Sequence, residues 1–224
     1  MPLNAQPAGR RVVPLVPHET ASGDDVLQVD GPFSASELQA MAHDGLLVHL
    51  CGATYLRAGA RPGPQIRARA MAAELPAALR DRAVIGRQSA LWIYTGGQVP
   101  AKINLLIDHR RRTSALRPFS GCQLHEVRLA ADDAAAVGAA ETAVTTPLRT
   151  AVDMALYAPE AESAAAVQAL TSHPMLDCPL ETVGARLESL VRVPRKRAAL
   201  ALVDALIAAR DPATTTAVPG PANR

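Results

Sequence analysis

The 224 residues are 49% hydrophobic and 20% charged, which provides enough apolar sequence for a core and excludes a chain that is disordered throughout. Aromatic residues make up only 3%, so the core must consist of Ala, Leu and Val, and base-stacking platforms for single-stranded nucleic acid are not expected. The net charge of +2 hides an asymmetry, because residues 1–56 carry −4, residues 57–117 carry +9 and residues 118–224 carry −3.

The first part of the chain predicts an irregular arm and then a short helix. Residues 1–24 contain four prolines and show no hydrophobic period, and the apolar run 26–29 follows them. Ser34 and Glu37 have the spacing of a capping box, in which the hydroxyl and the carboxylate bind each other's backbone N–H groups. The helix that they begin is expected to end near Gly45, which can adopt a left-handed conformation.

A hairpin is predicted directly after this helix. Residues 46–50 and 53–58 are apolar and rich in strand-forming side chains, and Cys51-Gly52 between them indicates a tight turn. A short helix followed by a two-stranded hairpin forms the second half of a winged helix. The prolines, glycines and acids before Ser34 leave room for one short element in front of it.

The middle of the chain alternates between helix and strand patterns. Residues 65–81 predict a helix that Pro76 breaks or kinks. Residues 83–94 begin as a short apolar strand and continue as a helical turn. Three further strands are predicted at residues 102–108, 122–129 and 143–146. Asp132-Asp133, placed before a run of alanines, predicts the start of a short helical turn, where acids are favoured by the helix dipole.

From Thr146 onward the pattern is helical. Thr146 is predicted as the N-cap of a helix and Pro147 as its first residue, because proline lacks only an N–H that would be unpaired there. Helices are expected at residues 147–157, 160–171, 179–192 and 195–210. The whole chain therefore predicts an α+β fold in five parts. These are an arm (1–24), a winged-helix-like module (25–60), a central α/β part (61–157), a helical C-terminal part (158–211) and a disordered tail (212–224).

The residues that usually carry catalysis do not form recognised patterns. The three cysteines are far apart and odd in number, which argues against a disulfide framework or a cysteine zinc site and predicts a reduced, cytoplasmic protein. The histidines lack metal-ligand spacing, the serines lack a nucleophile elbow, and the glycines form no phosphate loop. No apolar run reaches the length of a membrane span. The sequence thus predicts a soluble non-enzyme with no cofactor, no metal and no membrane partner.

An ordered set of motifs resembles a known family. The segment Val144-Thr-Thr-Pro-Leu-Arg-Thr-Ala-Val-Asp-Met-Ala155 is similar to the T-x-P-x-R-T-x-x-D-x-A signature of the AbiEi-like antitoxins of type IV toxin–antitoxin systems. The segments 38–59, 66–75, 83–96 and 99–107 resemble further family segments in the same order. The C-terminal stretch 192–206 fits the family's closing helix, so the resemblance covers roughly residues 33–207.

The resemblance implies a non-enzymatic antitoxin and transcriptional autoregulator. Its implied partners are operator DNA, bound by the N-terminal module, and a cognate nucleotidyltransferase-like toxin, antagonised by the rest of the chain; a homodimer is compatible with both. Some relatives carry an endonuclease-like domain after the motif, but the segment after Pro147 lacks a strand-borne acidic pair followed by lysine. The alternative is a protein-interaction module whose DNA-binding half has decayed.

Two groups of residues are the candidate site. If the helix after Ser34 is a recognition helix, its exposed side chains would read base edges, and basic residues would bind phosphates. The candidate DNA-binding residues are Ser36, Gln39, Ala40, His43, Arg57, Arg110, Arg111 and Arg112. The family-motif residues are Thr146, Pro147, Arg149, Thr150 and Asp153, and these are expected to be mainly structural, with Arg149 and Asp153 four residues apart on one helix and able to pair. For the arginine run, a solvated loop and an acidic protein partner are the alternatives to DNA.

Overall fold

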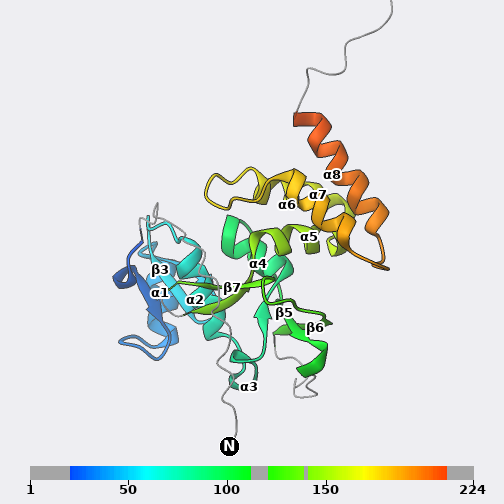
Figure 1. Ribbon diagram of the computed structural model, residues 1–224. Helices are drawn as coiled ribbons and strands as arrows, with labels where there is room; N and C mark the ends of the chain where they lie inside the picture. Colours follow the sequence, from blue (N-terminus) through cyan, green and yellow to red (C-terminus); the bar gives the residue numbers. More distant parts are fainter. Residues whose placement is uncertain (1–20, 112–120, 139–140, 211–224) are drawn as a thin grey trace, which may run out of the picture.

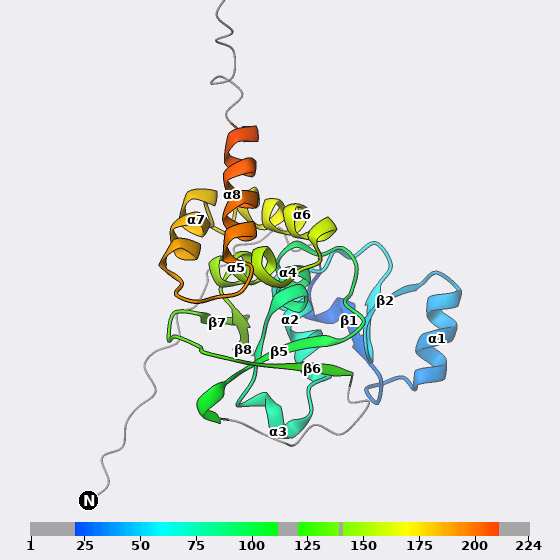
Figure 2. The same cartoon turned by 90° about the vertical axis from the view of Figure 1, so that its right-hand side faces the viewer.

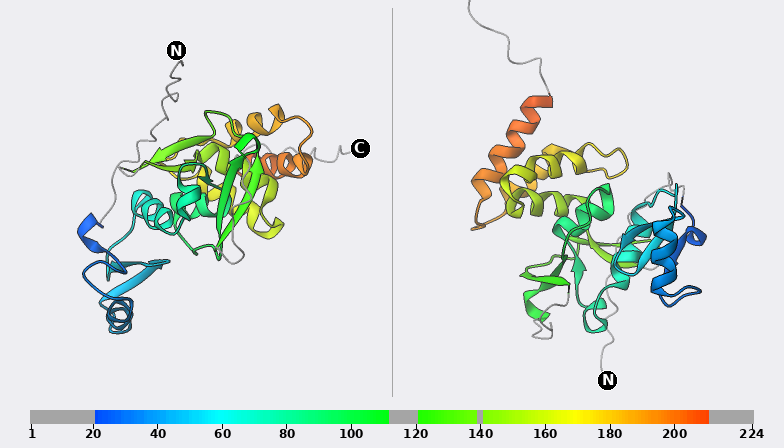
Figure 3. Two further views of the ribbon diagram at one scale, coloured as in Figure 1. Left: turned by 90° about the horizontal axis from the view of Figure 1, so that it is seen from below. Right: turned by 180° about the vertical axis from the view of Figure 1, so that it is seen from behind.

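The computed structural model describes residues 21–111, 121–138 and 141–210, and it has the predicted α+β fold (Figure 1). A small sheet with its helix lies at one end and a larger sheet, covered by helices, forms the rest. Figure 3 shows α1 at one end of the molecule and α8 at the opposite end. The predicted disordered tail and most of the predicted arm lie outside the described residues; within the arm, Gly23–Asp25 forms a 3₁₀ turn.

The N-terminal module is a three-stranded antiparallel sheet with one helix. Its elements are β1 (Val26–Gln28), α1 (Ala35–His43), β2 (Leu47–Cys51) and β3 (Thr54–Arg57). The strand order is β1-β3-β2, so β3 is central. The predicted helix and hairpin are confirmed. The capping box is also confirmed, since the Ser34 N–H donates to Glu37 at 2.8 Å and the Glu37 N–H donates to the Ser34 hydroxyl at 3.4 Å.

The two faces of this small sheet pack against different partners. On one face, Leu38 of α1 is fully buried against Leu47 and Tyr55. On the other face, Leu50 and Leu56 join the main core, which includes residues of α2 (Pro64–Ala73). The break predicted at Pro76 is confirmed, because α2 ends before it and the short α3 (Ala77–Arg80) follows.

The larger sheet is mixed and has five strands. Its elements are β4 (Val84–Ile85), β5 (Ile103–Asp108), β6 (Cys122–Val127), β7 (Ala134–Val137) and β8 (Thr142–Thr145). The order is β6-β5-β4-β8-β7, with β5–β6 and β4–β8 parallel and the other two pairs antiparallel. The central β4 thus lies between the β5–β6 pair and the β7–β8 pair, both of which follow it in the sequence.

Helices cover one face of this sheet. They are α4 (Arg87–Thr95), α5 (Pro147–Tyr157), α6 (Glu160–Thr171), α7 (Leu180–Ser189) and α8 (Lys196–Arg210). Figure 2 shows them above the sheet, with α3 below it. Ile85, Leu105 and Val144 point to the helical side, where they join the main core. No helix within 21–111, 121–138 and 141–210 is long and apolar enough to cross a membrane.

The helical turn predicted at Asp132-Asp133 is wrong. The two residues end a turn that leads into β7, and Ala134–Val137 pairs antiparallel with β8. The Asp133 carboxylate accepts a hydrogen bond from the Ala130 N–H at 2.9 Å, which stabilises the turn instead of a helix start. The high helix propensity of alanine is overridden here because β8 supplies a strand partner for the run.

Candidate functional site

The family motif lies at the start of α5, where the chain turns from β8 into the helical layer. The Thr146 hydroxyl accepts a hydrogen bond from the Arg149 N–H at 3.3 Å, and Pro147 is the first residue of the helix. Both features were predicted from the sequence and are confirmed. The helix packs against the sheet and its helical neighbours, and most of its residues are buried. The motif therefore fixes a helix in the interior of the protein.

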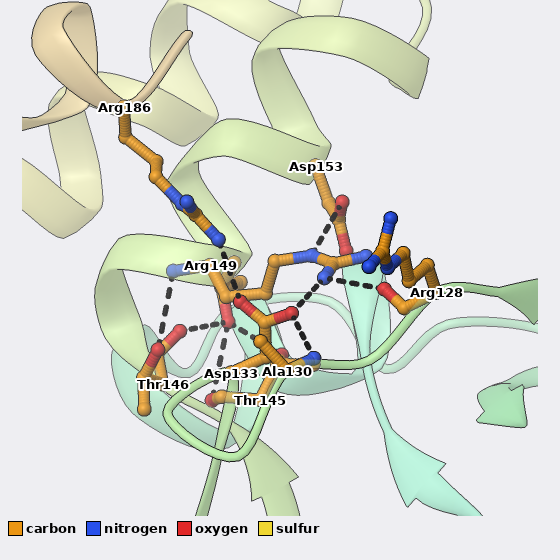
Figure 4. A network of polar contacts seen from close by, with 9 residues as sticks. Arg128, Ala130, Asp133, Thr145, Thr146, Arg149, Asp153 and Arg186 are labelled. Atoms are coloured by element: carbon orange, nitrogen blue, oxygen red, sulfur yellow. Dashed lines mark hydrogen bonds and ion pairs between the residues drawn. The ribbon is translucent and has the colours of Figure 1, made fainter. Parts of the chain in front are cut away.

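Arg149 pairs with two carboxylates (Figure 4). Its Nε donates to Asp153 Oδ1 at 3.0 Å, and its Nη1 donates to Asp133 Oδ2 at 2.5 Å. Nη1 also lies 3.4 Å from the backbone carbonyl of Arg128. The side chain of Arg149 is 13% exposed, and those of Asp133 and Asp153 are 6% and 3% exposed. The predicted pairing of Arg149 with Asp153 is confirmed.

Asp133 is the residue that sequence reasoning missed. Besides Arg149, its carboxylate binds Arg186 of α7 at 3.4 Å, and its backbone carbonyl accepts from the Thr146 N–H at 2.9 Å. It thus connects the turn before β7 to α5 and to α7. Arg149 and Arg186 are 16 and 53 residues away in the sequence, so no local pattern indicated the contact. We call Asp133, Arg149, Asp153 and Arg186 the arginine–aspartate network.

The motif threonines form a second set of contacts beside the arginine–aspartate network. The hydroxyls of Thr145 and Thr150 are 2.7 Å apart, and the Thr150 hydroxyl donates to the Thr146 carbonyl at 2.9 Å. The Tyr94 hydroxyl of α4 donates to the Thr145 carbonyl at 2.8 Å. These bonds tie the end of β8 to α4 and α5.

In the arginine–aspartate network, burial and the neighbouring charges shift the pKa values of Asp153 and Arg149 in opposite directions. Burial raises the pKa of Asp153 above its ordinary value, against the pull of Arg149, and Asp153 Oδ2 has no hydrogen-bond partner among the described residues. Burial would lower the pKa of Arg149, but the charges of Asp153 and Asp133 outweigh it and raise that pKa. Arg149 therefore stays charged and is the centre of the network.

A second arginine, Arg87, lies at the start of α4 in a left-handed conformation, with φ of 52°. Its guanidinium stacks 4.5 Å from the centre of the Tyr157 ring. His125 Nε2 is 3.3 Å from Arg87 Nη1 and 2.9 Å from Asn104 Oδ1. Because Asn104 Nδ2 donates to the Lys102 carbonyl, its Oδ1 faces the ring; Nε2 can donate to this oxygen or accept from Arg87, but it cannot do both at once. Burial, followed by the Arg87 charge, lowers the pKa of His125 to about 4.

The carboxylates of the arginine–aspartate network are engaged in internal ion pairs. The carboxylates of Asp133 and Asp153 are held by arginines, and no serine or cysteine side chain belongs to the network. Across residues 21–111, 121–138 and 141–210, no group of three or more His, Cys, Asp or Glu side chains could hold a metal ion. The chemistry of the network is that of a buried support for α5.

The predicted DNA-binding residues fall on separate surfaces. Those on α1 are all exposed on the side away from the sheet: Ser36, Gln39, Ala40 and His43. Arg57 is 68% exposed and lies 3.5 Å from Asp25. Arg110 is exposed in a 3₁₀ turn, His109–Arg111, that follows β5; Arg112 lies outside the described residues. Figures 1 and 2 both place α1 away from the end of β5, so the structure does not bring the two groups together.

The tip of the hairpin packs against the body of the protein. The Ala53 N–H donates to Glu74 at 2.8 Å, and the Glu74 side chain fills the space where a side chain at position 52 would lie. Gly52 is therefore required for close approach as well as for its φ of 52°. Between residues 21 and 60 the only charged side chains other than histidine are five carboxylates and Arg57, so the module is acidic.

The basic start of α8 also has internal partners. Arg195 and Lys196 bind backbone carbonyl groups. Lys196 Nζ donates to the carbonyls of Glu188 and Leu190 at 2.7 Å each, and Arg195 Nη1 donates to that of Ala158 at 3.3 Å. These carbonyls lie at the ends of α7 and α5, where cations are favourable.

Comparisons with known proteins give a weak structural likeness. No family model matches the chain, and no curated protein matches it. Among solved structures, the chain is similar to the RV2827C protein from Mycobacterium tuberculosis, with 18% sequence identity and a TM-score of 0.38. That match covers 80% of this chain and 71% of the other.

Proposed function

We propose that this chain is a non-enzymatic, AbiEi-like antitoxin and transcriptional autoregulator that antagonises a nucleotidyltransferase-like toxin and binds operator DNA. The observation that supports the proposal most is that Thr146, Arg149, Thr150 and Asp153, the residues that carry the resemblance, converge on one buried support for α5. These residues depend on one another for their polar contacts. The Thr146 hydroxyl accepts from the Arg149 N–H, and the Arg149 guanidinium pairs with the Asp153 carboxylate.

The DNA-binding part of the proposal depends on arginines outside the N-terminal module. Residues 21–60 carry five carboxylates against Arg57 alone, and DNA affinity comes largely from neutralised phosphates. Arg110 is exposed and belongs to the most basic segment of the chain. In this proposal α1 supplies base contacts, and the basic segment supplies phosphate contacts.

A protein-interaction module without DNA binding is the second candidate. Two observations favour it. The N-terminal module is acidic, and its hairpin tip is held by Glu74 and so cannot enter a groove of DNA without leaving the body of the protein. In this case the chain would still antagonise a toxin but would not bind the operator.

The test combines toxin rescue with DNA binding. A nucleotidyltransferase-like reading frame found beside the gene for this chain is induced with and without this chain, and growth is measured. Binding to upstream DNA is measured by fluorescence anisotropy over a series of salt concentrations. Replacing Arg110, Arg111 and Arg112 by Ala should weaken binding to all sequences and flatten the salt dependence by roughly one unit of slope for each arginine–phosphate pair that is removed.

The matched control replaces the exposed Arg192, Arg197 and Arg210 by Ala, which removes the same charge from another part of the chain. The first candidate is supported if growth is rescued and if DNA binding is weakened in the first variant but not in the control. Rescue without DNA binding supports the second. Failure to rescue growth refutes the antitoxin assignment.

A further inference from the structure

A groove of about 780 Å³ lies between α4, α6 and the start of β5, apart from the arginine–aspartate network. Leu91 and Trp92 of α4 and Met154 of α5 are among the apolar residues that line it. Figure 1 shows α4 and α6 approaching each other above the sheet. The volume is within the range of known ligand sites, which are mostly apolar with a few directed polar groups.

Several polar side chains that line this groove have no hydrogen-bond partner among the described residues, whereas Thr95 and Asn104 of the same lining are bonded internally. Three carboxamides, those of Gln88, Gln98 and Gln123, form no side-chain hydrogen bond with any of the described residues. The indole N–H of Trp92 is also without a partner in that part of the chain. A carboxamide both donates and accepts, so three of them match a ligand with alternating N–H and C=O groups. A polypeptide backbone has this alternation.

The opposite wall is made of small side chains. Ala161, Ala165 and Ala169 lie four residues apart on α6, are exposed, and face the groove. Their size lets a backbone approach the helix closely. The charged lining residues are one ammonium, Lys102, and one carboxylate, Glu162, so the groove favours a segment of low net charge.

A nucleobase fits this lining less well than a peptide. Stacking requires an aromatic face, but Trp92 is only 3% exposed and the other lining residues are not aromatic. A nucleotide would also bring two negative charges to a groove that holds a single lysine. We therefore propose that the groove binds an extended, nearly neutral segment of a protein partner. The identification of the partner as the toxin rests on the proposed function. The preference of the groove for a nearly neutral peptide does not rest on it.

The test presents the purified full chain with a displayed library of random linear 12-residue peptides. Enriched peptides are synthesised, and their affinities are measured by isothermal titration calorimetry. Ala165→Arg places a long charged side chain in the groove from an exposed helix position, and Ala201→Arg makes the same change on the exposed surface of α8. Circular dichroism and thermal melts establish that both variants fold.

We expect enriched peptides with net charge near zero, an affinity decrease of at least tenfold in Ala165→Arg, and a change of less than twofold in Ala201→Arg. Enrichment of no peptide, or equal binding to both variants, would overturn the proposal, as would groove binding of adenosine or guanosine that excludes the peptides. If Ala165→Arg fails to fold, Gln123→Ala on the exposed start of β6 replaces it, with the same expected direction. A nucleotidyltransferase-like protein found encoded beside this chain is titrated separately, so that its failure to bind refutes the toxin as partner while the peptide result stands.

Discussion

Replacing Arg149 by Ala should lower the free energy of unfolding by about 3 kcal/mol. The change removes the bonds to Asp153 at 3.0 Å and to Asp133 at 2.5 Å. Asp153 is then left without its arginine partner while 3% exposed, whereas Asp133 keeps Arg186 and the Ala130 N–H. Breaking a buried ion pair typically costs 3–5 kcal/mol, and the partners that Asp133 keeps place this case at the lower end. For a chain of this size the melting temperature should fall by roughly 6–12 °C.

The assay is thermal and urea unfolding followed by circular dichroism, with Arg186→Ala as the matched control. The side chain of Arg186 is 36% exposed and its distance to Asp133 is 3.4 Å, so its removal should cost less than about 1 kcal/mol. Equal decreases in stability in the two variants would refute the assignment of Arg149 as the centre of the network.

A double-mutant cycle with Asp153→Asn extends the test. Because burial raises the pKa of Asp153, removing its charge relieves a desolvation cost. The Arg149→Ala/Asp153→Asn variant should therefore be more stable than the sum of the single changes predicts. Additive changes would show that the two side chains do not interact.

Three further changes test other parts of the structure. Thr146→Ala should cost about 1 kcal/mol, while Thr146→Ser keeps the capping oxygen and should cost much less; equal effects would argue against the cap. His125→Gln should reduce the pH dependence of stability between about 6.5 and 4: the folded state holds the pKa of His125 at about 4, so the unfolded chain binds the proton first and wild-type stability falls as the pH drops through this window. An unchanged pH profile would contradict this. Glu74→Ala should cost about 1–3 kcal/mol and speed hydrogen exchange at the Ala53 N–H, whereas Glu74→Gln keeps an acceptor; unchanged exchange in both would mean that the hairpin tip is not held by this side chain.

Local signals in the sequence predicted the elements that depend on neighbouring residues. The predicted bounds 147–157 and 160–171 match α5 and α6; the Thr146-Pro147 start marks α5, and an amphipathic period supports it. The Ser34–Glu37 capping box likewise fixed the start of α1. In each case, the groups that satisfy the backbone come from within four residues.

Contacts between distant segments could not be predicted. Asp133 was assigned to a helix start because acids and alanines favour one, yet its carboxylate binds arginines of α5 and α7. The groove could not be predicted for the same reason, because Gln88, Gln98 and Gln123 come from α4, the loop after it and β6, which meet only after folding. The separation of the predicted DNA-binding residues on α1 from Arg110 also depends on tertiary arrangement.

The position of β4 in the larger sheet has a consequence for folding during synthesis. Ile85 of β4 pairs with Val144 of β8, so one edge of β4 stays unpaired until about 60 further residues have been made. The β7–β8 hairpin is local and can form by itself before it adds to this edge. Until then the chain exposes a strand edge of Val84 and Ile85, an arrangement prone to pairing with other chains. Pausing of the ribosome before residue 145 should therefore increase aggregation, and pausing after α5 has been released should not.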